Sequence, residues 1–266
     1  ASVSSKRALI VAPTYGDYLP ASQWAGLGVE FFNLKADEDF ALDFNRLSTH
    51  LTGGELVFLC NPNNPTGRVV ASRELLNFVL AHPASDFLVD ESYLPFVGEP
   101  SLVGFPLPVN LFVLCSSSKI YGIPGLRLGF LVASEEKMAR FAARRKPWGV
   151  NRMAQVAGEY LLAHGDAYVQ AVREYLAQAR PEFVARLAAL PGVRVTPGSA
   201  NFILGRLTGA MTAAQLREAM LGQRIMIRDC SNFTGLDAQY FRVSLQSSDR
   251  NERCLAALAG ILGEKP

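Results

Sequence analysis

Short runs of apolar residues recur along the first half of the chain. They occupy residues 8–12, 29–34, 56–60, 87–90, 111–115 and 128–132. Each run is continuous rather than alternating, which is typical of strands that are buried on both faces. Stretches with helical spacing lie between several of these runs, at residues 42–51 and 72–80. This alternation predicts an α/β fold with a mostly parallel sheet that is covered by helices.

The pattern becomes helical in the second half and then mixed. Helical spacing covers residues 136–146, 151–164 and 167–190, and Pro181 should kink or restart the last of these helices. Strand-like runs follow at residues 193–196, 201–206, 224–228 and 239–245, with helical stretches at 212–221 and 249–262. This tail predicts a smaller C-terminal α+β domain. We therefore place the large domain in residues 1–165, and the interdomain helix and small domain in residues 166–266.

The composition supports a globular protein without a polyanionic partner. The chain has 266 residues, of which 49% are hydrophobic, and it can bury a substantial core. Its 26 basic and 24 acidic residues give a net charge of +2, which predicts neither nucleic-acid binding nor membrane binding. The densest basic cluster contains Arg140, Arg144, Arg145 and Lys146, and we interpret it as the solvated stripe of a helix.

Metal, disulfide and histidine chemistry are not indicated. The four cysteines show no CxxC pairing, and the three histidines are scattered. We therefore expect no metal site and a reducing compartment. The sequence has no transmembrane pattern and no signal-peptide pattern at its start, so we expect a cytoplasmic protein.

Polar segments follow four of the predicted strands. They cover residues 13–18, 61–67, 90–93 and 116–119. Ligands of open parallel sheets collect beyond the carboxyl ends of the strands, so these segments are the candidate site. In the second segment, Asn-Pro-Asn-Asn-Pro-Thr-Gly, two prolines fix φ and Gly67 permits a positive φ. We expect a rigid turn with outward-pointing asparagine amides, although the segment alone could be only a sharp strand-to-helix connection.

Asp90 closes a predicted strand, so its carboxylate should be partly buried and should need a partner. A protonated ring nitrogen of a ligand would serve, and neighbouring backbone N–H groups are the alternative. Tyr93 lies three residues later and could offer its hydroxyl to the same ligand.

Lys119 stands in a segment of serines and glycines at the end of another strand. Ser116, Ser118 and Arg127 flank it with hydroxyls and a guanidinium that could bind a phosphate, while the lysine amine could attack a carbonyl. Such a nucleophilic amine must be unprotonated. An ion-paired lysine at a loop edge is the alternative interpretation of this segment.

Arg228 and Arg242 each end or interrupt an apolar run. A guanidinium fork suits planar oxyanions, so each arginine should face either an anionic ligand or a buried carboxylate. Taken alone, these two interpretations remain equally open.

Together these segments resemble the fold-type I pyridoxal-phosphate enzymes of the class I/II aminotransferase superfamily, from about Ala8 to the end of the chain. The resemblance implies that Lys119 forms a Schiff base with pyridoxal 5'-phosphate and that Asp90 pairs with the pyridine nitrogen. It also implies that Asn64 and Tyr93 hold the phenolic oxygen of the ring.

The same resemblance implies the remaining contacts. Ser116, Ser118 and Arg127 would bind the cofactor phosphate, and Tyr15 would stack on the ring. Arg242 would receive the α-carboxylate of a small phosphorylated amino-acid substrate, and Arg228 is our candidate for its phosphate.

Within the superfamily, residues 146–151 and 228–236 look like those of threonine-phosphate decarboxylases of cobalamin biosynthesis. This likeness implies decarboxylation of O-phospho-L-threonine to (R)-1-amino-2-propanol O-2-phosphate. Histidinol-phosphate aminotransferases, which transfer an amino group to 2-oxoglutarate, are the alternative. Such enzymes generally act as homodimers.

Members of the superfamily normally have several tens of residues before the equivalent of Ala8, including a segment that helps to hold the cofactor phosphate. We therefore expect the sequence to be a truncated form. A cofactor-free, inactive α/β fragment is the remaining hypothesis, and we expect a homodimer only for the full-length protein.

Overall fold

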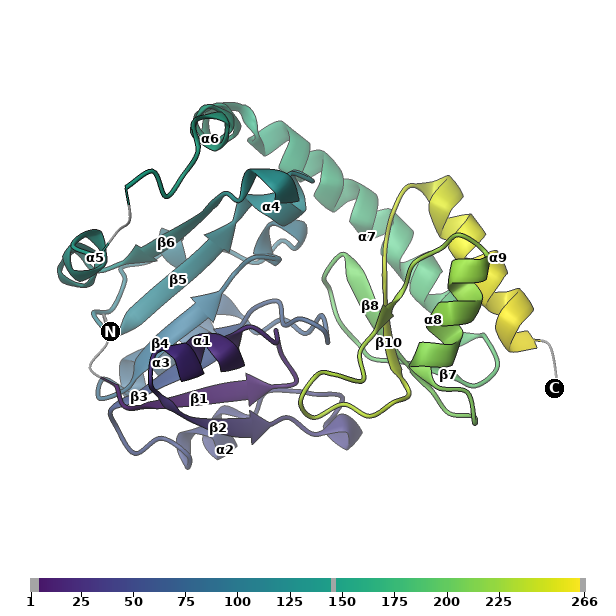
Figure 1. Ribbon diagram of the computed structural model, residues 1–266, viewed down its shortest axis with the longest axis horizontal. Helices are drawn as coiled ribbons and strands as arrows, with labels where there is room; N and C mark the ends of the chain where they lie inside the picture. The colour runs from purple at the N-terminus through teal and green to yellow at the C-terminus, as the bar shows by residue number, and fades with distance from the viewer. Residues whose placement is uncertain (1–4, 145–146, 264–266) are drawn as a thin grey trace.

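The computed structural model describes residues 5–144 and 147–263. Its large domain is built on a six-stranded sheet with the order β2-β1-β3-β4-β5-β6 (Figure 1). The strands are β1 (Arg7–Ala12), β2 (Gly28–Asn33), β3 (Glu55–Cys60), β4 (Asp86–Asp90), β5 (Leu111–Ser116) and β6 (Gly129–Ala133). All neighbours are parallel except β5 and β6, which are antiparallel. The predicted α/β fold with a mostly parallel sheet is confirmed.

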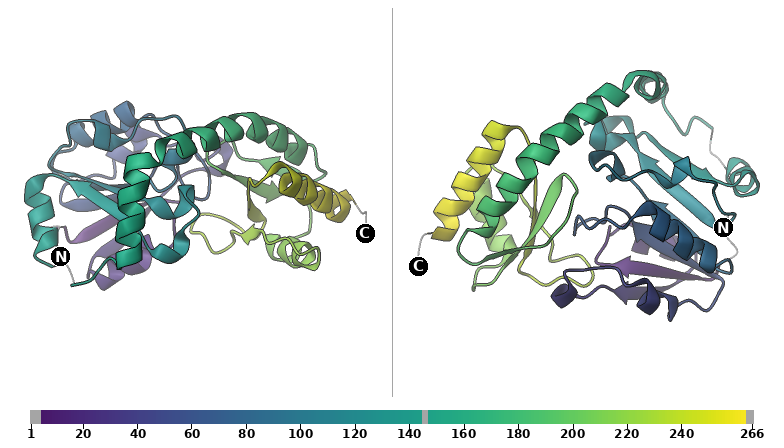
Figure 2. Two further views of the ribbon diagram at one scale, coloured as in Figure 1. Left: turned by 90° about the horizontal axis from the view of Figure 1, so that it is seen from above. Right: turned by 180° about the vertical axis from the view of Figure 1, so that it is seen from behind.

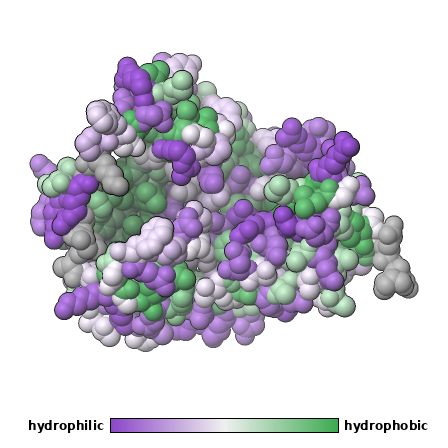
Figure 3. All heavy atoms as spheres, in the orientation of Figure 1, coloured by the Kyte–Doolittle hydropathy of each residue, from purple (hydrophilic) through white to green (hydrophobic). Residues whose placement is uncertain are grey.

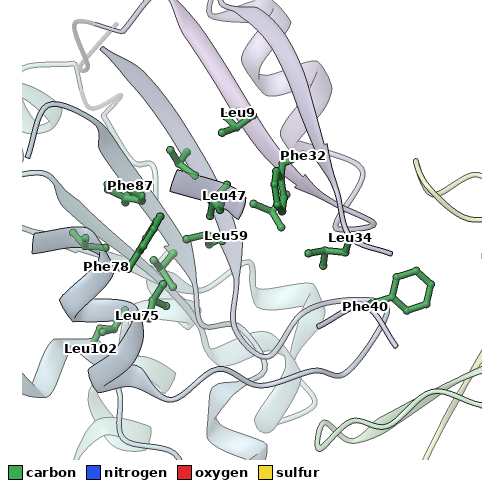
Figure 4. Packing of buried hydrophobic residues seen from close by; sticks show 14 of the residues in the cluster. Leu9, Phe32, Leu34, Phe40, Leu47, Leu59, Leu75, Phe78, Phe87 and Leu102 are labelled. Atoms are coloured by element: carbon green, nitrogen blue, oxygen red, sulfur yellow. The ribbon is translucent and has the colours of Figure 1, made fainter. Parts of the chain in front are cut away.

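Helices cover both faces of this sheet because successive residues of a buried strand point in opposite directions. On β1, Ala8 and Ile10 pack with Tyr18 of α1 (Tyr18–Trp24), while Leu9 packs in a larger cluster on the other face. That cluster, shown in Figure 4, includes residues of α2 (Phe44–Ser48) and α3 (Ser72–Ala81). Burying each such large apolar side chain stabilises the fold by about 1.5–3 kcal/mol.

The chain then turns into helices that lead to the second domain. They are α4 (Ser117–Ile120), α5 (Glu135–Ala142), α6 (Arg152–His164) and α7 (Asp166–Ala188), with 3-10 turns η1 (Ala36–Glu38), η2 (Leu94–Phe96), η3 (Leu102–Gly104) and η4 (Pro124–Leu126) elsewhere in the chain. Of the basic cluster near α5, Arg145 and Lys146 lie outside the described residues.

Helix α7 continues through Pro181, so the predicted restart at this residue is wrong. Tertiary contacts hold the helix at this point. The half-buried Arg180 guanidinium donates hydrogen bonds to the carbonyls of Gly198 and Ala200, at 2.9 and 2.8 Å. Figure 2 shows α7 running from the large domain along the small one.

The small domain has an antiparallel four-stranded sheet with the order β7-β8-β10-β9, covered by α7, α8 and α9 on one face. Its elements are β7 (Val193–Val195), β8 (Phe202–Leu207), α8 (Ala213–Gly222), β9 (Arg228–Asp229), β10 (Tyr240–Ser244) and α9 (Ser248–Gly263). The predicted strand at 224–228 is wrong except at Arg228. Arg224 has a φ of 58°, outside the β region, and Met226 is 78% exposed.

The two domains touch through both hydrogen bonds and apolar contacts. The Ser199 N–H donates to the Gly67 carbonyl at 2.7 Å, and Leu204 and Tyr240 of the small sheet join the core of the large domain. The division between residues 165 and 166 stays a prediction; it falls between α6 and α7. Within the described residues, no helix combines the length and apolar character needed to cross a membrane. Figure 3 shows hydrophobic side chains gathered in a hollow of the large domain, left of centre.

Candidate active site

A cavity of about 310 Å³ lies beyond the carboxyl ends of β3, β4 and β5. It brings together all eight residues predicted to bind the cofactor. These are Tyr15, Asn64, Asp90, Tyr93, Ser116, Ser118, Lys119 and Arg127. The parallel register of the sheet explains this convergence, because it places the segments that follow neighbouring strands at the same edge.

The turn at residues 61–67 contains three asparagines. Asn64 lines the cavity, and the side chains of Asn61 and Asn63 form hydrogen bonds that stabilise the turn. The Asn61 amide pairs with the backbone of Val70 in both directions, at 2.8 and 2.9 Å. Asn63 donates to the Pro13 carbonyl at 2.9 Å and accepts a hydrogen bond from Thr14. The expectation that these amides point outward is therefore wrong for Asn61 and Asn63, whose side chains are buried.

Asn64 differs from them because it lines the cavity. Its Oδ1 accepts a hydrogen bond from Nη1 of Arg242, which lies on the small domain. Among the described residues, no hydrogen-bond partner is found for its Nδ2, which leaves this donor available to a ligand in the cavity.

Asp90 is 5% exposed and its carboxylate has two partners. The Ser92 N–H donates to Oδ1 at 2.8 Å, as in the alternative considered from the sequence, and the Tyr18 hydroxyl donates to Oδ2 at 2.6 Å. Burial raises the pKa of Tyr18 well above its ordinary value, so this hydroxyl keeps its proton. Neither partner is a cation, and a carboxylate held in this way can still accept a hydrogen bond from a protonated ligand nitrogen.

Tyr18 was not singled out from the sequence as a site residue. It starts α1, three positions after Tyr15, so helical spacing after β1 was the available signal. The tyrosine ring stacks on Phe58 of β3 at 5.2 Å between centroids, which fixes the position of its hydroxyl.

The segment around Lys119 is a helical turn, α4, rather than the loop expected from its serines. The Oγ of Ser116 caps the turn by accepting from the Ser118 N–H at 3.2 Å. Ser118 is buried, whereas Lys119 is exposed on the open side of the cavity. In the described ranges, no carboxylate lies within ion-pair distance of the Lys119 amine, which argues against the ion-paired alternative for this lysine.

Tyr15 and Arg127 come from distant parts of the sequence, and both line the cavity. The Tyr15 hydroxyl donates to the Asp17 carboxylate at 2.5 Å, and this bond raises the pKa of Tyr15 to about 12. Arg127 has a φ of 57° and donates from Nη1 to the Pro124 carbonyl at 3.1 Å. Its remaining guanidinium donors can serve an anion.

Tyr93 connects the cavity to the small domain. Its ring meets Phe202 of β8 edge-on at 4.9 Å between centroids. Burial raises the pKa of Tyr93, while the nearby Arg242 charge acts in the opposite direction. The tyrosine is therefore a neutral hydroxyl donor at ordinary pH.

Two cysteines that line the cavity were also missed. Cys60 ends β3 and Cys115 lies on β5. Burial raises the pKa of both thiols, that of Cys115 to about 12, so neither is a thiolate nucleophile. No group of three or more His, Cys, Asp or Glu side chains suited to a metal occurs in residues 5–144 and 147–263.

Arg228 and Arg242 lie together, and neither is among the residues that line this cavity. They face each other across the β9–β10 ladder and line a separate groove of about 740 Å³. No carboxylate within the described residues forms an ion pair with either, so the salt-bridge alternative has no support there. Arg242 joins the two spaces through its hydrogen bond to Asn64.

The residues of the cavity fit pyridoxal phosphate. Its volume is within the usual range of about 300–1,000 Å³ for small-molecule sites. Two serine hydroxyls and the Arg127 guanidinium suit a phosphate, the buried Asp90 suits a protonated ring nitrogen, and Lys119 offers an amine for the aldehyde carbon.

Comparisons with known proteins agree with this arrangement. The model of the family "aminotransferase class I and II" matches residues 2–258. The threonine-phosphate decarboxylase of Salmonella typhimurium is 36% identical over 97% of this chain and 71% of its own length.

Two solved structures share the fold. The crystal structure of L-threonine-O-3-phosphate decarboxylase from Porphyromonas gingivalis superimposes with a TM-score of 0.86 at 34% identity, covering 98% of this chain and 78% of the other. The histidinol-phosphate aminotransferase from Clostridium acetobutylicum gives a TM-score of 0.91 at 28% identity, covering 98% and 80%.

Fold and site together define a fold-type I enzyme of the pyridoxal-phosphate class. The chain belongs to the class I and II aminotransferase family, which includes both aminotransferases and decarboxylases.

Proposed function

We propose that this chain decarboxylates O-phospho-L-threonine to (R)-1-amino-2-propanol O-2-phosphate, with pyridoxal phosphate bound at Lys119. The observation that carries the proposal is the pair of arginines, Arg228 and Arg242, which lie beside the cavity and form no ion pair with a carboxylate of the described residues. The substrate has two anionic groups, an α-carboxylate and a phosphate, that can occupy these two cations.

When bound, the cofactor would accept the electron pair that remains on Cα after carbon dioxide leaves. Asp90 would accept a hydrogen bond from the protonated ring nitrogen, with Tyr18 and Ser92 holding the carboxylate. The Lys119 amine would add the proton that Cα needs once the bond to the carboxylate has broken. Arg242 would orient the carboxylate group, and Arg228 the phosphate.

A second candidate is amino transfer from histidinol phosphate to 2-oxoglutarate. It is favoured by the higher TM-score of the Clostridium acetobutylicum aminotransferase, 0.91 against 0.86. Our first choice is supported by the decarboxylases of Salmonella typhimurium and Porphyromonas gingivalis, which are 36% and 34% identical to this chain, against 28% for the Clostridium acetobutylicum aminotransferase. A histidinol-phosphate aminotransferase of Methanothermobacter thermautotrophicus also reaches 34% identity, but over 78% of this chain rather than 97%. The two reactions differ in which bond to Cα breaks.

The cofactor part of the proposal is tested first. Protein soaked with pyridoxal phosphate should gain a visible absorbance band that is lost in Lys119→Ala. The matched control is Lys35→Ala, which removes an exposed lysine that pairs with Glu38 and does not line the cavity. A colourless wild-type protein would support the third hypothesis, a cofactor-free fragment.

The reaction is then tested by product. The loaded protein should release carbon dioxide from O-phospho-L-threonine in equal amount to the phosphorylated amino alcohol. Glutamate formation from histidinol phosphate and 2-oxoglutarate, without carbon dioxide release, would establish the second candidate instead.

We also propose that the full-length protein is a homodimer, supported by an apolar stripe on α6. Met153, Val156 and Tyr160 share one helix face and are exposed, and Trp148, which precedes this helix, is 95% exposed. Light scattering of the full-length protein should give twice the monomer mass, and Tyr160→Glu should shift it toward the monomer. A monomeric full-length wild type would contradict this proposal.

The proposal also places the enzyme in the cytoplasm and in cobalamin biosynthesis, on the strength of the decarboxylase resemblance. A strain lacking it should require the phosphorylated amino alcohol for cobalamin formation. Cobalamin formation by such a strain without the added compound would contradict this part of the proposal.

A further inference from the structure

The groove of about 740 Å³ is more basic than the proposed substrate requires. Six arginines line it: Arg217, Arg224, Arg228, Arg242, Arg250 and Arg253. The residues that line it include no aspartate or glutamate. Two of the arginines are accounted for by the proposed substrate, and four have no role in it.

The four additional arginines come from different elements that converge on one space. Arg217 lies on α8, Arg224 precedes β9, and Arg250 and Arg253 lie on α9. In the described part of the chain only Arg217 of the six is ion-paired, with its neighbour Glu218 at 2.8 Å. Gathering so many unneutralised cations costs free energy through mutual repulsion, and a bound polyanion would relieve it.

Local contacts hold the walls of the groove in place. Arg253 donates from Nη2 to the Gln223 carbonyl at 2.8 Å, which ties α9 to the end of α8. Arg228 donates to Asn232 at 2.9 Å. Arg242 Nε is buried and has no hydrogen-bond partner in the described structure, so one donor of a residue that lines the groove is unsatisfied.

We propose that this groove binds an oligophosphate, an anion with two or more linked phosphate groups. One phosphate carries at most two charges near neutral pH and cannot neutralise the five guanidinium groups that have no ion pair among the described residues. The volume is within the range of small-molecule sites. None of the lining residues is aromatic, so the groove offers no ring on which a nucleotide base would stack and the phosphate chain itself is the recognised group.

Direct binding tests this inference and does not depend on catalysis. Calorimetry with tripolyphosphate, at saturating pyridoxal phosphate, should give one site that binds at least about tenfold more tightly than inorganic phosphate. Repeating the titration with Arg127→Gln excludes the cofactor phosphate site as its source. A nucleoside triphosphate should bind as tripolyphosphate does if only the phosphates are recognised.

The diagnostic variant is Arg224→Gln/Arg250→Gln, because neither side chain has an ion-pair partner among the described residues. Its tripolyphosphate affinity should fall by about tenfold or more. The matched control is Arg140→Gln/Arg144→Gln, which removes the same charge from exposed residues of the large domain and should leave the affinity within about twofold. Equal losses in both variants would reduce the effect to net charge and overturn the inference.

Two other outcomes would also overturn it. Binding that depends on charge alone would not distinguish tripolyphosphate from another polyanion, so a glutamate-rich peptide that binds equally tightly would identify a general cationic surface. Equal affinity for tripolyphosphate and inorganic phosphate would show that the groove holds a single phosphate. If the proposed function is correct, oligophosphate should compete with substrate, because both use Arg228 and Arg242. If the protein shows no turnover but still binds tripolyphosphate as expected, the proposed function is contradicted and this inference is not.

Discussion

The small sheet contains two pairs of arginines that face each other across neighbouring strands, and their surroundings differ. Arg194 faces Arg206 across β7 and β8, and Arg228 faces Arg242 across β9 and β10. Like charges in this position repel each other. Arg194 pairs with Asp39 at 3.2 Å and Arg206 with Asp237 at 2.9 Å, so the first pair is neutralised within the protein.

The second pair has no such carboxylates within the described residues. All four arginines are on the face of the sheet toward the large domain, since Leu204 shares a face with Arg206 and lies opposite Arg242. The same residue type on the same face thus has two uses. In the first pair, Arg194 binds Asp39 of the large domain and Arg206 binds Asp237 of the small domain. The second pair remains available to an anionic ligand, as the proposed function requires.

The largest effect should come from Arg242→Gln. This variant removes the cation that hydrogen-bonds Asn64 at the cavity and would orient the substrate carboxylate. Steady-state kinetics should show a fall in kcat/KM of about 100-fold or more. The matched variant Arg206→Gln removes a cation from the neutralised pair and should change kcat/KM by less than about threefold; similar losses in both would remove the distinction between the pairs.

Arg228→Glu should have a smaller effect on catalysis than Arg242→Gln. It should weaken substrate binding without lowering the stability of the fold. The new carboxylate would face Arg242 and convert the second pair into an internal ion pair like the first. We expect KM for O-phospho-L-threonine to rise by about tenfold or more, while denaturant unfolding shows stability unchanged or raised by up to about 1 kcal/mol. A clear loss of stability with unchanged KM would mean that Arg228 is structural.

The smallest effect should come from Asp39→Asn/Asp237→Asn, which leaves the first pair unneutralised. Both ion pairs are largely exposed, so the free energy of unfolding should fall by no more than about 1 kcal/mol, and salt should lessen the loss. Turnover should stay unchanged. A large fall in activity would show that the first pair also serves the site.

Much of the fold could be predicted because continuous apolar runs need burial on both faces. The inner strands β1, β3, β4 and β5 follow this rule, and the polar segments at their ends reach one cavity as expected. The edge strands β2 and β6 do not, because most of their residues are half-buried or exposed. Arg224 and Met226 show where the rule fails: the run is apolar enough for a strand, but a positive φ and exposure of Met226 keep it out of the sheet. Pro181 shows the opposite case, where contacts of Arg180 far along the chain preserve a helix.

Sequence motifs predicted the residues of the site only where those residues follow closely after the end of a strand. The sequence did not identify Tyr18 as a site residue because its partner, Asp90, is 72 residues away. Only the pairing of the β strands brings the Tyr18 hydroxyl within 2.6 Å of Oδ2 of Asp90. The opposition of Arg228 and Arg242 depends on the register of β9 and β10, which the sequence does not encode locally.

The most direct measurement is carbon dioxide release from O-phospho-L-threonine by the protein loaded with pyridoxal phosphate, compared between the wild type and Arg242→Gln. We expect the wild type to release carbon dioxide together with an equimolar amount of the phosphorylated amino alcohol, and the variant to release almost none under the same conditions. Absence of carbon dioxide from a wild type that carries its cofactor band, or equal release by both proteins, would contradict the proposed function.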